Sequence, residues 1–209
     1  MMYLISQDHR GQECGREVEE LFRLRYRVFK ERLEWNVECQ DGMEKDRFDE
    51  LNPVYLAYRN AAGAVEGCIR LLPTTGPNML RDVFPALLDG QQAPDSPRIW
   101  ESSRFSLDTT STDKSQVGLT RATHELFAGM IEFGLMWGLT HIVTVTDLRV
   151  ERILRRSGWP LERLGVAQRI GDVTAVAGFL ETSSRTLERV CEIGGLRRPI
   201  LWMPVQLAA

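Results

Sequence analysis

One arginine in the middle of an apolar helical stripe constrains this chain more than any other feature of its sequence. Side chains at steps of three and four place these residues on one helical face: Val18, Leu21, Phe22, Arg25, Val28, Phe29 and Arg32. A guanidinium at Arg25 needs a carboxylate, because burying an unpaired charge is costly. Asp46 and Asp49 stand three apart in the turn-rich segment that follows, free to fold back toward the helix. These residues alone fit a structural ion pair or a functional site equally well.

The composition predicts one soluble globular domain. The 209 residues are 43% hydrophobic and 26% charged, and no linker or repeat divides them, so we expect a single domain over residues 1–209. The N-terminal segment lacks a basic leader, and no apolar run is long enough to span a membrane, which predicts a cytoplasmic protein without membrane insertion. A net charge of -3 argues against general affinity for nucleic acid.

The cysteines and histidines match no familiar metal site or catalytic triad. The four cysteines are widely spaced and are expected to be reduced: Cys14, Cys39, Cys68 and Cys191. His9, His124 and His141 lie near no recognisable nucleophile motif, so we expect surface or boundary positions for all three. Nucleotide-binding signatures rich in glycine are also absent from the sequence.

The periodicity alternates strands with helices, which predicts an α/β fold. Strands are expected over residues 54–59, 65–72, 98–107, 142–147, 164–170, 175–181 and 200–205. After the first helix, further helices are expected over residues 116–137, 148–157 and 184–193, with a short helical turn and loop around Phe84. The helix over residues 148–157 has one face with Arg149, Arg152 and Arg156. The simplest interpretation is that these three arginines are exposed to solvent.

Glu101 is a second charge that the pattern places on an apolar face. Alternation puts it with Ile99, Ser103, Phe105 and Leu107, while Arg104 points to the other side. Such a carboxylate must be paired, protonated or used as an acid or base. Residue types alone favour a structural salt bridge over catalysis. A strand-edge bulge would let Arg104 reach the acidic pair.

Taken together, these residues resemble the signature of acyl-homoserine-lactone synthases, the LuxI-type autoinducer synthases. The matching positions run in order through residues 20–160: Arg25, Phe29 and Trp35 in R-x-x-x-F-x-x-R-L-x-W, Asp46 and Asp49 in D-x-x-D, Arg70, and Glu101-Ser102-Ser103-Arg104-Phe105. The resemblance implies a GNAT-like three-layer α/β fold with a mixed, twisted sheet and a central cleft. It also implies transfer of an acyl chain from acyl carrier protein to the amine of S-adenosylmethionine, followed by lactonisation that releases methylthioadenosine and a quorum-sensing signal.

The resemblance further implies a role for each matched residue. Glu101, Ser103 and Arg104 are expected to be catalytic, with Glu101 as the base that deprotonates the amine directly or through a water. S-adenosylmethionine is a substrate, so no separate cofactor is expected. Contacts to S-adenosylmethionine are expected from Arg25, Phe29, Trp35, Asp46, Asp49, Arg70 and Phe105. Thr144 is expected in the acyl pocket, where its hydroxyl favours a 3-oxoacyl product. In this setting Arg149, Arg152 and Arg156 become a docking face for the acidic carrier protein.

Two rival functions stay open from the sequence. A CoA-dependent GNAT-type N-acyltransferase acting on another amine should carry a Q/R-x-x-G-x-G/A turn for the pyrophosphate. Gln116-Val117-Gly118-Leu119 matches that turn only in part. A non-enzymatic small-molecule sensor would use Glu101 and the two aspartates only as architecture.

Overall fold

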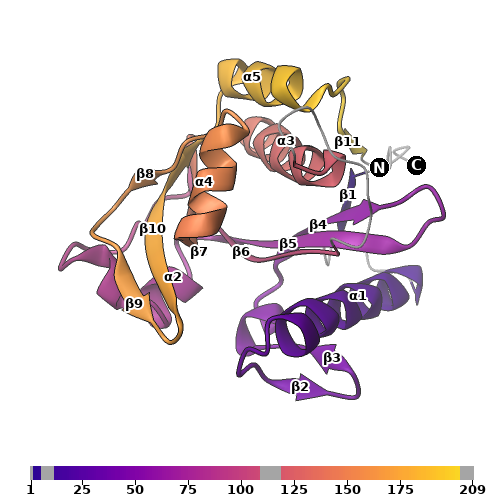
Figure 1. Ribbon diagram of the computed structural model, residues 1–209, viewed down its shortest axis with the longest axis horizontal. Helices are drawn as coiled ribbons and strands as arrows, with labels where there is room; N and C mark the ends of the chain where they lie inside the picture. The colour runs from indigo at the N-terminus through magenta and orange to yellow at the C-terminus, as the bar shows by residue number, and fades with distance from the viewer. Residues whose placement is uncertain (1, 6–11, 109–118, 203–209) are drawn as a thin grey trace.

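One mixed sheet organises the computed structural model, which describes residues 2–5, 12–108 and 119–202 (Figure 1). The sheet order is β11-β1-β4-β5-β6-β7-β10-β8, with β9 paired to β10. β1 with β11 and β6 with β7 are parallel, and the other pairs are antiparallel. Its strands are β1 (Met2–Ile5), β4 (Val54–Arg59), β5 (Val65–Pro73), β6 (Ile99–Leu107), β7 (His141–Asp147), β8 (Glu162–Arg163), β9 (Gln168–Ile170), β10 (Val173–Glu181) and β11 (Leu201–Trp202).

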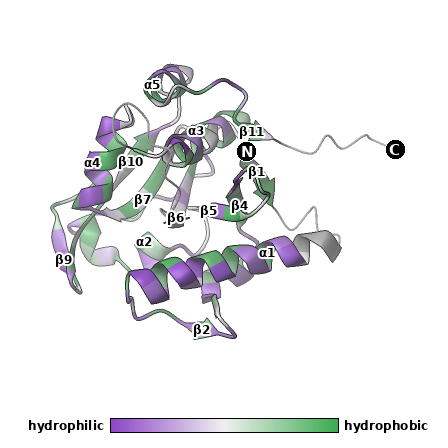
Figure 2. Ribbon diagram, turned by 45° about the vertical axis from the view of Figure 1, so that its right-hand side comes forward, coloured by the Kyte–Doolittle hydropathy of each residue, from purple (hydrophilic) through white to green (hydrophobic). Residues whose placement is uncertain are grey.

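Helices cover both faces of the sheet (Figure 1). The elements on one face are α1 (Gln12–Arg25), the π-helix Tyr26–Arg32 that continues it, α2 (Met79–Asp82) and the 3-10 helix Pro85–Leu88. The elements on the other face are α3 (Arg121–Met136), α4 (Leu148–Arg156) and α5 (Ser184–Gly194). α1 carries alternating hydrophilic and hydrophobic stretches, as an amphipathic helix does (Figure 2). Its apolar residues pack against residues of β1, β4 and β5, which confirms the predicted stripe.

Side-chain caps set where the helices of the second face begin. Thr120 accepts a hydrogen bond from the Thr123 N–H at 3.2 Å, and Asp147 accepts one from the Val150 N–H at 2.7 Å. Capping satisfies backbone donors that have no partner within the helix. The helices predicted over residues 148–157 and 184–193 are confirmed, and the helix predicted over residues 116–137 is confirmed from Arg121 onward. Residues 116–118 and 203–205 of the predicted elements lie outside the described part of the chain.

The sheet splits between its two central parallel strands. Pairing of β6 with β7 runs from Ile99 with His141 to Ser102 with Thr144. Beyond that point β6 follows β5 as far as Leu107, whereas β7 follows β10 as far as Asp147. The divergence opens the predicted central cleft at the carboxyl ends of two parallel strands.

Some short strands were not predicted. β1 is buried at all four positions, so its sequence shows no alternation, and we had expected no strand before residue 54. A two-stranded sheet of β2 (Cys39–Gln40) and β3 (Met43–Glu44) was also missed, because such short strands leave no periodic signal. Asp41 and Gly42, at φ of 52° and 70°, form the turn that pairs them.

A bulge in β6 corrects the predicted faces of that strand. Arg104 has a φ of 54°, and the register with β5 shifts between Cys68 and Arg70. Ile99 packs with the apolar cluster beside α2, whereas Phe105 and Leu107 pack in the main core on the opposite face. The predicted alternation was wrong beyond Ser103, because one irregular residue reverses every later side chain.

His124 is fully buried, so its predicted surface or boundary position was wrong. α3 is covered by α5 as well as by the sheet, and a Cβ at Gly194 would lie only 2.7 Å from the Cβ of His124. His141 is partly buried beside the Phe179 ring, and His9 lies outside the described residues. Cys39, Cys68 and Cys191 are free thiols, while the side chain of Cys14 is not described. Among the helices that the structure describes, none combines the length and apolar character needed to cross a membrane.

Candidate active site

Arg25 lies at the end of α1, where its guanidinium is fully buried between two carboxylates. Its Nη1 and Nη2 donate to Oδ1 and Oδ2 of Asp49 at 2.8 and 2.9 Å, and its Nε donates to Oε2 of Glu44. Two parallel bonds between arginine and carboxylate are a strong, geometrically specific arrangement. The predicted pairing of Arg25 with the acidic segment is confirmed, and Asp49 is the aspartate that makes it.

Asp46 pairs with two other arginines. Arg70 Nη1 and Nη2 donate to its two carboxylate oxygens, and Arg104 Nη2 lies 2.8 Å from Oδ2. Arg70 Nη1 also reaches Asp49 Oδ1 at 2.9 Å, and Arg104 Nε reaches Glu44 Oε1 at 3.0 Å. The bonds close into one network with equal numbers of opposite charges, which we call the charged frame: Arg25, Glu44, Asp46, Asp49, Arg70 and Arg104.

Local backbone geometry presents these side chains. Asp46 caps the 3-10 helix Arg47–Glu50, accepting from the Phe48 N–H at 2.9 Å, while Asp49 accepts from the Asp46 N–H at 2.8 Å. The bulge at Arg104 turns that side chain to the α1 face, as the bulge hypothesis required. The π-helix begins directly after Arg25, and π turns are frequent at functional sites.

The charged frame keeps the Asp49 carboxylate ionised although its side chain is buried. Burial alone would raise the pKa of Asp49, but the hydrogen bonds and charge of Arg25, with the charge of Arg70, hold that pKa far below its ordinary 3.8. The Tyr55 hydroxyl also donates to Asp49 Oδ1 at 2.6 Å. Burial alone would lower the pKa of Arg25, but its hydrogen bonds to Asp49 and Glu44 and the charges of these carboxylates raise that pKa.

Two aromatic rings lie beside the charged frame. Phe29 and Trp35 stack with centroids 5.2 Å apart and planes 10° from parallel, and Arg104 lies over the Phe29 ring at 5.7 Å. Phe29 is buried, whereas Trp35 is 41% exposed. Trp35 therefore offers the accessible aromatic surface, and Phe29 supports it from behind.

Glu101 is buried on the same face of β6 as Ser103. Its two carboxylate oxygens accept hydrogen bonds from the backbone N–H groups of Met79 and Leu80 at 2.9 and 2.6 Å. Burial raises the pKa of Glu101 above its ordinary 4.5, and these two bonds offset only part of that rise. The partners of Glu101 are amides, so the salt bridge that residue types favoured is not its main environment.

The loop before β6 carries more chemistry than the sequence indicated. The sequence predicts only a helical turn and loop there, yet Met79 Sδ accepts from Arg70 Nη2 at 3.2 Å and from Arg104 Nη1 at 3.7 Å. Met79 thus links Glu101 to the charged frame. The Met79 backbone N–H bonds to the Glu101 carboxylate, and the Met79 side chain bonds to the arginines of the frame. Ser103 joins the frame as well, because its Oγ accepts from Arg70 Nε at 3.1 Å.

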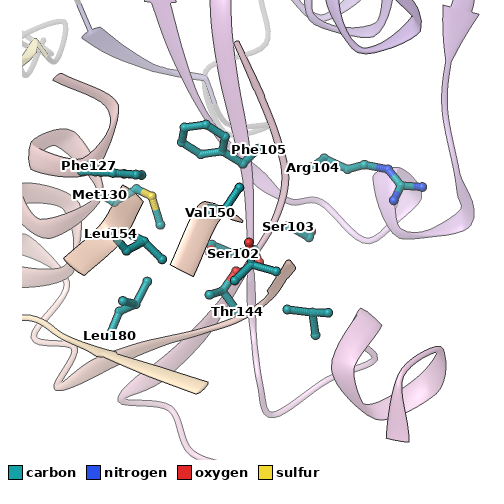
Figure 3. Close-up of a pocket in the computed structure, with 12 residues that line it drawn as sticks. Ser102, Ser103, Arg104, Phe105, Phe127, Met130, Thr144, Val150, Leu154 and Leu180 are labelled. Carbon is teal, nitrogen blue, oxygen red and sulfur yellow. The ribbon is translucent and has the colours of Figure 1, made fainter. Parts of the chain in front are cut away.

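A mainly apolar cavity of about 60 Å³ occupies the split between β6 and β7 (Figure 3). Its lining residues are Ser102, Ser103, Arg104, Phe105, Phe127, Met130, Thr144, Val145, Thr146, Val150, Leu154 and Leu180. Thr144 lines this cavity, and its Oγ1 donates to the Ser102 carbonyl oxygen at 3.1 Å. Phe105, expected to contact S-adenosylmethionine, lines the cavity and packs against Phe127 with ring centroids 5.5 Å apart.

Family membership is decided by the match of residues 11–190 to the family model described as autoinducer synthase. The chain belongs to the autoinducer synthase family. An acyl-homoserine-lactone synthase of Rhizobium radiobacter is 42% identical over 195 residues, which cover 93% of this chain and 92% of that relative. The predicted activity, that of an acyltransferase making acyl-homoserine lactones, is confirmed by these relatives.

Solved structures of autoinducer synthases share the fold. The synthase LasI is 36% identical with a TM-score of 0.78, covering 91% of this chain and 93% of LasI. BjaI, described as a CoA-dependent acyl-homoserine lactone synthase with SAM and isopentyl-CoA, is 27% identical with a TM-score of 0.87, covering 98% and 93%. The GNAT-like fold that we predicted is confirmed.

In this autoinducer synthase, the predicted site residues fall into three places. The charged frame with Trp35 lies on the α1 face, and Thr144 and Phe105 lie in the cavity of the other face. Arg149, Arg152 and Arg156 are exposed on α4, whose inward residues Val150 and Leu154 line that cavity. No cluster of three or more potential metal ligands occurs within the described ranges.

Glu44 is the site residue that sequence reasoning missed. It is completely buried and bridges Arg25 to Arg104. The available signal was the Asp41-Gly42 turn, which sends the chain back toward α1 just before Glu44. Nothing in the sequence distinguishes this buried carboxylate from the many exposed ones, because its partners lie on β6 and α1.

Proposed function

We propose that this acyl-homoserine-lactone synthase takes its amine from S-adenosylmethionine and its acyl chain from acyl carrier protein. The observation that supports the proposal is the position of Ser103 and Arg104. Both line the apolar cavity, and both bond to members of the charged frame on the opposite face of the sheet. A polar, charged substrate and an apolar chain would therefore meet at these two residues of β6.

The charged frame and Trp35 suit the amino-acid and sulfonium parts of S-adenosylmethionine. A preformed set of paired charges orients a zwitterion without having to reorganise when it binds. Trp35 offers an exposed ring to the cationic sulfonium, an interaction that aromatic faces favour. In this proposal Arg25, Asp46, Asp49 and Arg70 hold the substrate, Phe29 supports Trp35, and Phe105 contacts the acyl chain instead.

Amide formation requires a base, because the amine must lose a proton to become a nucleophile. In the proposed reaction Glu101 accepts that proton directly or through a water. Its pKa is raised and therefore lies closer to neutral pH, which suits a general base. The amine nitrogen then bonds to the thioester carbonyl carbon and the carbon–sulfur bond breaks. The sulfur takes up the second proton that the nitrogen loses, so the carrier leaves as a thiol. Ser103, whose oxygen is engaged by Arg70, keeps its own O–H available to the carbonyl oxygen.

Lactone formation needs positioning more than proton transfer. The methionyl carboxylate attacks the carbon attached to the sulfonium, that carbon–sulfur bond breaks, and methylthioadenosine leaves. The nucleophile is already ionised and the leaving group is good, so holding the two ends together is the main contribution of the protein. The proposal includes no further cofactor, and it places the reaction in the cytoplasm.

The acyl donor has two candidates, acyl carrier protein and acyl-CoA. Exposed Arg149, Arg152 and Arg156 favour an acidic carrier protein. The likeness to a synthase described as CoA-dependent makes acyl-CoA the second candidate.

A thiol-release assay with purified protein and S-adenosylmethionine tests the proposal, using matched acyl chains on acyl carrier protein and on CoA. We expect faster release from the carrier protein, with acyl-homoserine lactone and methylthioadenosine formed in equal amounts by mass spectrometry. Faster turnover of acyl-CoA would establish the second candidate. Thiol release without lactone, or with another amine only, would contradict the proposed reaction.

A further inference from the structure

Trp159 is fully buried and is among the largest side chains in the core. It follows Gly158, whose φ of 82° ends α4. Its backbone N–H donates to the Leu154 carbonyl at 3.0 Å, and its indole Nε1–H donates to the Glu181 carbonyl at 2.8 Å. A buried tryptophan with its N–H satisfied is held at both ends, here to α4 and to the last residue of β10.

The indole stands directly behind the inner wall of the cavity. Its ring packs edge-on against Phe127, with centroids 5.9 Å apart and planes at 65°. Phe127 lines the cavity, and so do Leu154 and Leu180, which belong to the two elements that Trp159 bonds. These three lining side chains are each no more than 3% exposed. The inner end is therefore closed by apolar residues that share one rigid support.

The other end of the cavity is polar and reaches the charged frame. Ser103 and Arg104 lie there, and Figure 3 shows Arg104 on the side away from Phe127, Met130 and Leu154. A chain that enters beside Arg104 must stop at the wall supported by Trp159. The cavity volume of about 60 Å³ is only a few times the roughly 10–15 Å³ that a cavity needs to hold a single water molecule.

We infer that Trp159, although it does not line the cavity, sets the length of acyl chain that the enzyme accepts, and that its preferred substrates are short straight-chain acyl thioesters. The inference rests on the proposed function, because it takes this cavity as the acyl site. A longer chain has no space at the closed end, and the wall cannot yield cheaply because the core around it is close-packed. Replacing the indole by a smaller side chain leaves space into which Phe127 and the leucines can move.

The test compares wild type with Trp159→Leu on an equimolar mixture of butanoyl, hexanoyl, octanoyl, decanoyl and dodecanoyl thioesters of acyl carrier protein. We expect wild type to favour the shorter chains and the variant to shift its product distribution toward longer ones. For each methylene that the enlarged cavity of Trp159→Leu can bury, the yield of the longer product relative to wild type should rise about fourfold. This factor corresponds to the free energy of burying one methylene group. Trp137→Leu is the matched control, because Trp137 is 41% exposed at the end of α3 and stacks on Phe133 outside the cavity lining.

The outcomes separate the inference from the proposed function. A folded Trp159→Leu enzyme with the wild-type chain-length distribution would overturn the inference, as would a Trp137→Leu enzyme with the same shift. If Trp159→Leu does not fold, Trp159→Phe keeps a ring against Phe127 and should give a smaller shift in the same direction. The wild-type distribution is itself decisive, because equal yields from octanoyl and dodecanoyl thioesters would contradict a closed end. A wild type that releases thiol from none of them overturns the proposed function and this inference together.

Discussion

Arg25 and Asp49 face each other with two parallel hydrogen bonds, of 2.8 and 2.9 Å, and both side chains are completely buried. The pair joins the end of α1 to a 3-10 helix that follows the β2–β3 turn. Each residue also bonds to a further member of the charged frame, Arg25 to Glu44 and Asp49 to Arg70. A change at one member therefore leaves buried charges without partners at others.

We expect Arg25→Ala and Asp49→Ala each to lower the free energy of unfolding by about 3–5 kcal/mol, the cost of leaving a buried charge unpaired, and to abolish product formation. The double variant should cost less than the sum by about 0.5–3 kcal/mol, because the second change removes the stranded partner. Urea unfolding and lactone yield measure the two effects. Arg23→Ala is the control, since its bond to Glu19 is half exposed and should contribute about 0.5 kcal/mol or less. Additive losses at Arg25 and Asp49 would show that the network is not coupled.

Asp49 should also make the free energy of unfolding depend on pH. Its pKa is lower in the folded state than in the unfolded chain, so its contribution is complete above the ordinary pKa and is lost as pH falls toward the folded value. The difference in unfolding free energy between wild type and Asp49→Asn should therefore shrink below about pH 4. Urea titrations at several pH values and constant ionic strength measure it. A difference that stays constant through this range would exclude Asp49 as the source.

Glu101→Gln should lower the acylation rate by about 100-fold or more, the scale of a lost general base. The wild-type rate should rise with pH through a pKa above the ordinary 4.5, and this limb should disappear in the variant. Because glutamine offers only one oxygen to the Met79 and Leu80 amides, thermal unfolding and S-adenosylmethionine binding must be measured alongside. A stable variant that turns over at the wild-type rate would assign Glu101 a purely structural role.

Charge reversal at two of Arg149, Arg152 and Arg156 should raise the apparent KM for acyl carrier protein and make it less sensitive to salt. Rim charges act mainly through association, so kcat should change little. Reversal at Arg16 of α1 and Arg185 of α5, both exposed on other helices, is the matched control. If KM and its salt dependence stay at the wild-type values, the three arginines are ordinary solvated charges.

Thr144→Val should reduce the preference for 3-oxoacyl over unsubstituted thioesters by several-fold, because one hydrogen bond contributes about 1 kcal/mol. The Thr144 hydroxyl already donates to the Ser102 carbonyl, so reading a 3-oxo group requires it to rotate away from that bond. Thr146→Val is the control, since Thr146 lines the same cavity from the same strand. Product ratios from paired thioesters decide the matter, and equal ratios for wild type and Thr144→Val would show that Thr144 does not read this position.

The sequence by itself determined the elements with a strong period and the residues with unusual chemistry. The apolar stripe around Arg25 required a buried ion pair, and the structure has one. Glu101 on an apolar strand face required a buried carboxylate with partners, which it has. The helices predicted over residues 116–137, 148–157 and 184–193 followed from their apolar period, which is a local signal, although the first of them begins only at Arg121.

Only the tertiary structure decided how these residues meet. One positive φ at Arg104 moved Phe105 to the opposite face and brought Arg104 to Asp46, and local sequence does not specify such a bulge. Glu44 became part of the site through partners about 20 and 60 positions away in the chain. The cavity exists because β6 and β7 diverge after Ser102 and Thr144, and Trp159 supports it through contacts with α3, α4 and β10. Contacts of this kind are set by the packing of distant elements, so no window of the sequence contains them.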